Sequence, residues 1–148
     1  MAQFDVLLLS VHLLATVYMT GLVWFVQVVH YPLFAAVGAE AFPSYERSHV
    51  ERAGWAVGPA MLVELATAAT LLASPGILGV TAPAIGGALL LVIWASTWAA
   101  QVPLHRRLMG GFDARAAALL VRSNWVRTGA WSARSALALW MLLEGASS

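Results

Sequence analysis

Histidine side chains that could bind a metal lie close to the ends of three separate apolar segments. His30 closes the first apolar run, His49 precedes the second, and His105 closes the third. Glu46 stands three residues before His49, so E-x-x-H places a carboxylate beside an imidazole if this segment is helical. Imidazole and carboxylate ligands suit iron, copper and zinc. The sequence therefore predicts a transition-metal site with the three histidines as ligands and Glu46 as a fourth ligand or a catalytic base.

Further polar residues share the helical faces of these candidate ligands. Gln27 and Tyr31 lie on one stripe with His30 at spacings of i, i+3 and i+4. Tyr45 precedes His49 by one helical turn, and Gln101 precedes His105 in the same way. We expect Tyr31 to act in catalysis, and Gln27, Tyr45 and Gln101 to contact substrate or to support the ligands.

A fourth segment carries a polar stripe of its own. Asn124, Arg127, Trp131 and Arg134 follow the i, i+3, i+7, i+10 spacing of a single helical face. Arg127 could hold a carboxylate or phenolate of the substrate, so it joins the predicted catalytic residues. Asn124 and Arg134 are predicted to contact substrate or to support the site.

Two charges and one histidine lie deep inside apolar segments. Glu64 and Arg134 should both fall near the middle of a bilayer, where an unpaired charge costs several kcal/mol. We therefore expect them to pair, either as a structural ion pair or as part of a proton relay or substrate contact. His12 precedes His30 by about 27 Å of helix, so it is expected to be a packing residue or the ligand of a second cofactor on the opposite side.

The elements that must position these residues are long and apolar. The chain has 148 residues, of which 61% are hydrophobic and only 10% are charged, and its mean hydropathy is +0.79. Because a transmembrane helix needs about 20 apolar residues and lipid requires internally bonded backbone, we predict helices. The expected fold is an all-α, integral membrane four-helix bundle forming one domain over 1–148, with spans at 6–31, 53–73, 83–104 and 114–143.

Arginine placement predicts how the bundle sits in the membrane. The chain has eight arginines and no lysine. Six of them flank the two polar connections, whereas the third connection and both termini carry none; the six are Arg47, Arg52, Arg106, Arg107, Arg115 and Arg122. The positive-inside rule places the polar connections in the cytoplasm and both termini outside. This topology brings the polar ends of all four helices to the cytoplasmic face of what we expect to be a bacterial inner membrane.

Two segments resemble known families of small membrane proteins. SVHLLATVYMTGLVWFVQVVHYPLF is similar to the opening helix of HemJ-type protoporphyrinogen oxidases, with His12, Gly21 and His30 in the same order. PLHRRLMGGFDARAAALLVRSNWVRTGAW resembles both that family, through its histidine and R-x-N, and the anthrone oxygenase-like family, through P-x-x-R-x-L, N-W and a late arginine. The resemblance implies a four-helix membrane fold and oxidoreductase chemistry, with haem b as a possible cofactor.

These observations favour a membrane-embedded oxidoreductase that uses iron, copper, zinc or haem b and acts on a small lipophilic substrate near the cytoplasmic face. Two alternatives stay open: a small transporter that uses Glu64 and Arg134, and a binding or scaffold protein that presents its basic face to lipid or a partner. A net charge of +1 gives no indication of nucleic-acid binding. The expected partners are the bilayer, a lipophilic small molecule and further copies of the chain. The sequence leaves the metal and the substrate open.

Overall fold

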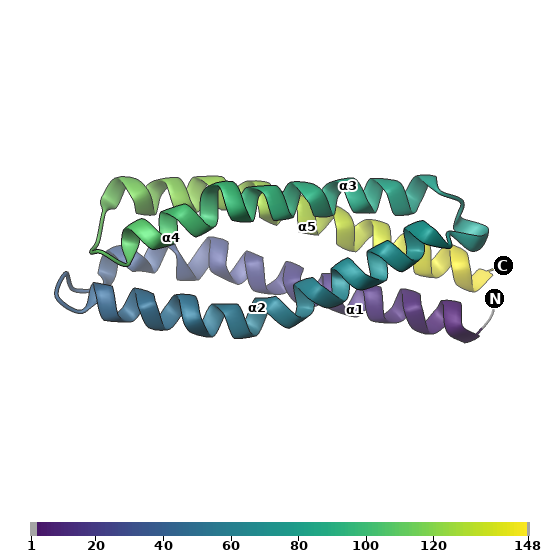
Figure 1. Cartoon of the computed structure of the whole chain (residues 1–148), viewed down its shortest axis with the longest axis horizontal. Helices are drawn as coiled ribbons and strands as arrows, with labels where there is room; N and C mark the ends of the chain where they lie inside the picture. The colour runs from purple at the N-terminus through teal and green to yellow at the C-terminus, as the bar shows by residue number, and fades with distance from the viewer. Residues whose placement is uncertain (1–2, 148) are drawn as a thin grey trace.

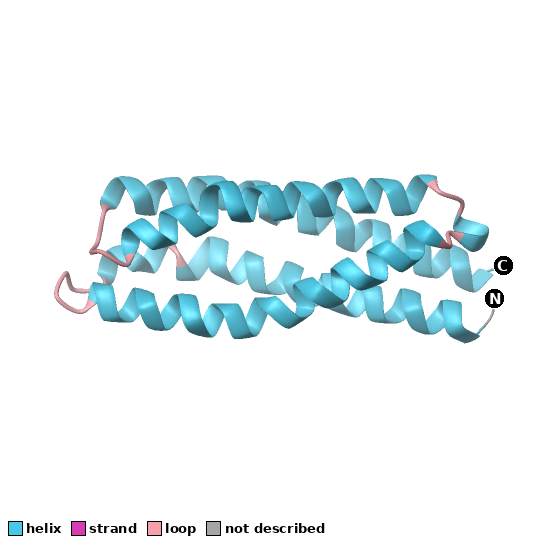
Figure 2. Ribbon diagram, viewed as in Figure 1, coloured by secondary structure: helices cyan, strands magenta, loops and turns pink. Residues whose placement is uncertain are grey.

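The computed structural model describes residues 3–147, and these form four helical columns packed side by side (Figures 1 and 2). The elements follow in the order α1 (Gln3–Phe25), η1 (Val26–His30), η2 (Pro32–Ala36), α2 (Phe42–Ala73), η3 (Gly76–Leu78), α3 (Thr81–Ser96), η4 (Thr97–Gln101), α4 (Val102–Leu108) and α5 (Ala114–Ser147). Both ends of the chain lie at one end of the bundle, and the two arginine-flanked connections lie at the other (Figure 1). The predicted all-α, four-helix architecture is confirmed.

Three of the columns are long and apolar enough to cross a membrane. They span Asp5–Ala36, Phe42–Ala73 and Thr81–Leu108. The fourth column, α5, is not among the helices that reach this hydropathy within the described residues. Its sequence contains four arginines: Arg115, Arg122, Arg127 and Arg134. It packs against both α1 and α3, so the predicted fourth element exists as a helix of the bundle but is more polar than a typical span.

The second column begins much earlier than position 53. α2 starts at Phe42, with Pro43 in its first turn, where the missing N–H of proline costs no hydrogen bond. The segment that looked like a polar connection is therefore helical, and it buries Phe42 and Glu46 completely. This extension places Glu46 and His49 on one helix, as their spacing requires for a shared face.

The first turn of α5 is fixed by Asp113. Its Oδ1 accepts hydrogen bonds from the backbone N–H groups of Ala116 and Arg115, at 3.0 and 2.9 Å, which makes it the N-cap of this helix. Its other oxygen lies 2.5 Å from Nη2 of Arg107. The Ala116 hydrogen bond is the main reason that the pKa of Asp113 lies below its ordinary value, with Arg107 acting in the same direction and partial desolvation opposing it.

Aromatic residues fill the core at the end of the bundle that carries the polar connections. Phe34 and Phe42 are fully buried there, with Leu108 and Leu120 beside them. Phe34 meets Phe42 edge to face at a centroid distance of 5.7 Å. This apolar layer supports the polar side chains described next.

Candidate functional site

The three predicted histidine ligands lie together, although they come from separate segments. Nε2 of His30, at the end of η1, is 2.9 Å from Nδ1 of His49 on α2. The ring centroids of His30 and His49 are 4.5 Å apart, and those of His49 and His105 on α4 are 5.1 Å apart. The predicted convergence of these side chains at one end of the bundle is therefore present in the structure.

His105 stands between a carboxylate and a phenol. Its Nδ1 lies 2.5 Å from Oε1 of Glu46, and its Nε2 lies 3.0 Å from the hydroxyl of Tyr31. Glu46 is fully buried and Tyr31 is 5% exposed. A carboxylate that accepts from Nδ1–H leaves Nε2 as the acceptor of the tyrosine hydroxyl. Glu46, His105 and Tyr31 thus form a continuous hydrogen-bonded chain, called here the relay.

A second polar chain joins the first column to α5. Oε1 of Gln27 accepts a hydrogen bond from Nδ2 of Asn124 at 3.0 Å, and Oδ1 of Asn124 accepts one from Nη1 of Arg127 at 3.2 Å. Arg127 also interacts with Tyr31, so this chain meets the relay. Its guanidinium lies over the ring of Trp131, 5.1 Å from the centroid. The predicted stripe on α5 is therefore one buried face.

Tyr45 and Gln101 border the relay in different ways. The ring of Tyr45 packs against those of His30 and Phe34, with centroid distances of 6.3 and 5.8 Å. Nε2 of Gln101 donates to Oγ of Ser123 at 2.9 Å, which ties the third column to α5. Tyr45 therefore lies beside His30, whereas the hydrogen-bond partner of Gln101 is Ser123 and its predicted role stays a prediction.

Two π-helical turns flank the site, and the sequence reading missed them. η1 ends at His30 and η4 ends at Gln101. A proline follows each turn by two residues, Pro32 and Pro103, and the proline ring clashes with the carbonyl four residues before it. In both cases that carbonyl lies inside the π turn. A proline two residues after the turn is therefore the feature of the sequence that could have predicted it. π turns of this kind are frequent at functional sites.

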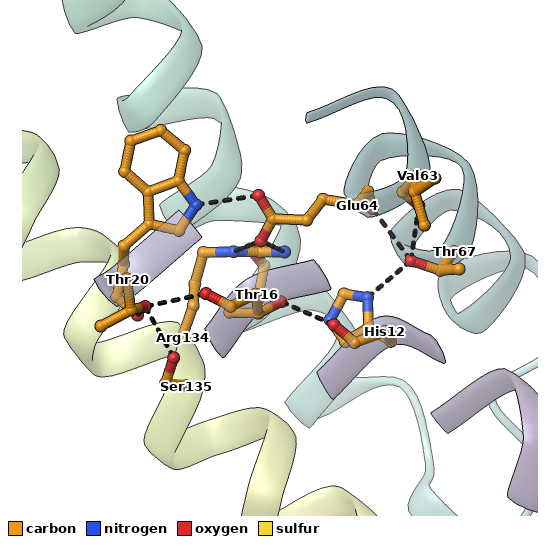
Figure 3. Close-up of polar contacts among 10 residues, drawn as sticks. His12, Thr16, Thr20, Val63, Glu64, Thr67, Arg134 and Ser135 are labelled. Carbon is orange, nitrogen blue, oxygen red and sulfur yellow. Dashed lines mark hydrogen bonds and ion pairs between the residues drawn. The ribbon is translucent and has the colours of Figure 1, made fainter. Parts of the chain in front are cut away.

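A separate polar layer occupies the middle of the bundle (Figure 3). Nη2 of Arg134 lies 3.2 Å from Oε1 of Glu64, and Nε1 of Trp131 donates to Oε2 of the same carboxylate at 2.8 Å. Nη1 of Arg134 donates to the carbonyl of Gly86. The predicted ion pair between Glu64 and Arg134 is confirmed, and each charged group has a further hydrogen-bond partner.

His12 belongs to this middle layer. Its Nδ1 lies 2.7 Å from Oγ1 of Thr67 (Figure 3). His12 and Arg134 also line a cavity of about 10 Å³, the space of a single water molecule. This space is far too small for a haem. The surroundings of His12 therefore match the packing role that was one of its two predicted roles.

The predicted metal site with His30, His49 and His105 as ligands is not formed among the described residues, because these imidazoles are hydrogen-bonded to one another, to Glu46 and to Tyr31. Two ligand nitrogens on one ion lie about 2.9–3.4 Å apart for bonds of about 2.0–2.1 Å, and the separation of His30 Nε2 and His49 Nδ1 is within this range. Both nitrogens of His105 are engaged in the relay. Accordingly, no group of three or more His, Asp or Glu side chains within residues 3–147 is placed to hold a metal ion.

Haem ligation by both histidines does not fit this arrangement. Two histidines that bind one haem iron from opposite faces hold their nitrogens about 4 Å apart, twice a metal–nitrogen bond of about 2.0–2.1 Å. The observed separation between His30 and His49 is 2.9 Å. The two nitrogens are at hydrogen-bonding distance, so they are not spaced for a haem between them.

The site combines a pair of adjacent imidazoles with a buried relay that can orient and move a proton. Comparison with known proteins adds no assignment. No family model matches the chain, and no curated protein or solved structure is significantly similar to it.

Proposed function

We propose that this protein is a membrane-embedded oxidoreductase that acts on a small lipophilic substrate at the histidine cluster. The observation that carries the proposal is the relay from Glu46 through His105 to Tyr31, buried beside the His30–His49 pair. A carboxylate that orients an imidazole, which in turn contacts a hydroxyl, is a recurrent arrangement for acid–base and nucleophilic chemistry. A structural role alone does not require three imidazoles in a row, with His49 in contact with both His30 and His105.

The proposed setting is a lipid bilayer with the polar connections in the cytoplasm and both termini outside. Three candidate spans and the one-sided distribution of arginine support this setting. The site then lies at the cytoplasmic membrane face, where a lipophilic substrate can approach from the bilayer and a proton can be exchanged with water. α5 completes the bundle and turns Arg127 and Arg134 inward, away from lipid.

His30 and His49 are the proposed metal ligands. A redox-active transition metal bound there would supply electron transfer or dioxygen chemistry, and substrate or water would complete its coordination. Imidazole nitrogens suit copper, iron and zinc, and of these copper and iron are redox-active and would supply this chemistry. The protein contributes two donors held on separate helices.

The relay handles the proton in this proposal. His105 can take a proton at Nε2 from the hydroxyl of Tyr31, or return it there. Glu46 holds the ring in orientation and stabilises its charged form, because the carboxylate is fully buried and contacts Nδ1. The buried guanidinium of Arg127 lies close enough to Tyr31 to interact with it and places a positive charge at this end of the relay.

Metal content and visible absorption of the purified full chain test the proposal. We expect bound iron or copper near one equivalent, lost when His30 and His49 are both changed to alanine. His12→Gln is the matched control, because it removes an imidazole from the middle layer and should retain the metal. Circular dichroism confirms that each variant is helical. A folded, colourless wild-type protein that takes up no metal would contradict the proposal.

A further inference from the structure

Trp131 contacts both the middle layer of the bundle and a cation beside the relay. Nε1 of Trp131 donates to Oε2 of Glu64 at 2.8 Å. On its other side, the guanidinium carbon of Arg127 lies over the ring, 5.1 Å from the centroid. Arg127 and Trp131 are one helical turn apart on α5, and Trp131 is fully buried. One indole therefore joins the carboxylate of the middle ion pair to a cation that interacts with Tyr31.

The orientation of this indole is fixed by contacts from three helices. Glu64 on α2 lies 3.4 and 3.2 Å from two guanidinium nitrogens of Arg134 on α5 (Figure 3). Arg134 donates in turn to the carbonyl of Gly86 on α3. These contacts keep the Glu64 carboxylate in place, and the carboxylate keeps the indole N–H in place. The ring that faces Arg127 cannot turn without breaking a charge-assisted hydrogen bond.

The guanidinium of Arg127 depends on this ring for its position. Nη1 of Arg127 donates to Oδ1 of Asn124 at 3.2 Å, whereas Nε has no hydrogen-bond partner among residues 3–147. A cation–π contact is strongest when the cation is shielded from water, as this buried guanidinium is. Stacking on Trp131 is therefore a main determinant of where the positive charge lies relative to Tyr31.

We propose that Trp131 is a positioning residue that couples the Glu64–Arg134 ion pair to the relay. The Glu64 carboxylate orients the indole and polarises it through Nε1–H, which strengthens the attraction between the ring face and the guanidinium. The ring places Arg127, and Arg127 acts on the hydroxyl of Tyr31. The inference rests on the proposed function, because the relay is the part of that function it supports, but it requires neither metal nor substrate.

NMR of the metal-free full chain in detergent tests this coupling. The Cζ resonance of Tyr31 reports the hydrogen bonding of its phenol, and the ring nitrogen resonances of His105 report the hydrogen bond that joins the two residues. Trp131→Phe keeps an aromatic face for Arg127 but removes the N–H that Glu64 holds. We expect the resonances of both Tyr31 and His105 to shift. Trp140→Phe, at an exposed position of the same helix, is the matched control and should leave them unchanged.

Glu64→Gln perturbs the same contact from the other side. It should shift the Tyr31 resonance when it is introduced into the wild type, and it should add little in the Trp131→Phe background, because the connection between the two is then already broken. Fluorinated tryptophan provides a measurement without a mutation, so the test does not depend on a variant that folds. Fluorine withdraws electron density from the ring face and weakens its attraction for a cation. The Tyr31 resonance should therefore move progressively as one, two and three fluorine atoms are introduced.

Shifts at Tyr31 and His105 that are confined to Trp131→Phe and Glu64→Gln support the coupling. Wild-type resonances in folded Trp131→Phe, equal shifts in Trp140→Phe, or no response to fluorination would overturn it and leave Trp131 as a packing residue. The result is independent of metal uptake. Coupling in a protein that binds no metal would sustain this inference while contradicting the proposed function, and metal uptake without coupling would do the reverse.

Discussion

Glu64 and Arg134 meet in the middle of the bundle, where a single carboxylate oxygen, Oε1 of Glu64, lies 3.4 Å from Nε and 3.2 Å from Nη2 of the guanidinium. The exposed fractions of the two residues are 0% and 1%. Trp131 donates to the other carboxylate oxygen and the Gly86 carbonyl accepts from the third guanidinium nitrogen, so each side-chain nitrogen and oxygen of the pair has a partner. A buried ion pair whose polar atoms all have partners is well suited to fixing the packing of α2 against α5.

Removing one member of this pair should destabilise the protein strongly. Arg134→Met leaves the Glu64 carboxylate buried without its partner, which typically costs about 3–5 kcal/mol. The double variant Glu64→Gln with Arg134→Met should lose clearly less than the sum of the two single variants, because it leaves no isolated charge. Equilibrium unfolding in detergent measures all three free energies. Arg122→Met, at an exposed position of α5, is the control and should have little effect. Strictly additive losses would show that the two side chains are not energetically coupled.

The Glu46 carboxylate should also contribute to stability, in addition to its proposed role in the relay. Glu46→Gln preserves shape but replaces a charged acceptor of His105 Nδ1–H with a neutral group. We expect a loss of about 1–3 kcal/mol in the free energy of unfolding, the range for weakening a buried charge-assisted hydrogen bond. Glu51→Gln on the same helix is exposed and should change stability by less than about 0.5 kcal/mol. Equal effects of the two variants would argue against a strong contact between Glu46 and His105.

Most of the site could be predicted because topology alone brings it together. Four apolar segments in alternating directions must place His30, His49 and His105 at one end, and helical spacing selects their neighbouring faces. Asp113 was recognisable as a cap because an acceptor before ARAAALLVR satisfies free N–H groups. These inferences need only periodicity and charge.

Other features depend on tertiary packing that the pattern does not contain. The segment from Phe42 to Arg52 is polar enough to look like a connection, and it is helical because Phe42 and Glu46 are buried in the bundle. The hydrogen bonds of His105 to Glu46 and Tyr31 could not be predicted either, since spacing defines a face and not a rotamer. The π turns could have been predicted only from the clash of Pro32 and Pro103 with the carbonyls four residues before them.

Membrane orientation can be tested with single cysteines, because the chain contains none. Ser44→Cys lies in the first turns of α2, near the proposed cytoplasmic face, and Ser74→Cys lies at the opposite end of that helix. Both positions are exposed. In intact bacterial cells we expect a membrane-impermeant maleimide to label Ser74→Cys and to leave Ser44→Cys unlabelled until the cells are permeabilised. The reverse pattern would invert the orientation, and equal labelling of both in intact cells would argue against insertion.

The cap at Asp113 should make stability depend on acid pH. Because the pKa of Asp113 is lowered in the folded chain, principally by the N–H of Ala116, the ionised carboxylate stabilises the fold. This contribution is fully present above the ordinary pKa of 3.8 and is lost as the pH falls through the lower folded pKa. Asp113→Asn keeps an acceptor for the N-cap but loses the charge and the contact with Arg107. The unfolding temperatures of wild type and variant should therefore differ at pH 6 and converge at strongly acidic pH; a constant difference would contradict this account.

Pro103 should hold the π turn that directs Gln101 and His105 into the site. Proline at this position lacks the N–H that would bond the Ala99 carbonyl, and its ring clashes with that carbonyl. Pro103→Ala restores the donor, so the turn η4 can rewind to an α-helix. Removing the extra residue of a π turn rotates the following segment by about 100° relative to the preceding one, since an α-helix has about 3.6 residues per turn. His105 then moves away from Glu46.

Nitrogen NMR of the histidine rings should show loss of the Nδ1–H signal typical of a bond to a carboxylate. The free energy of unfolding of the variant should equal or exceed that of the wild type. Pro59→Ala, inside α2 and remote from both π turns, is the matched control and should leave the histidine signals unchanged. If Pro103→Ala also preserves them, the packing of Gln101 against Ser123 maintains the π turn, and the proline only accommodates it.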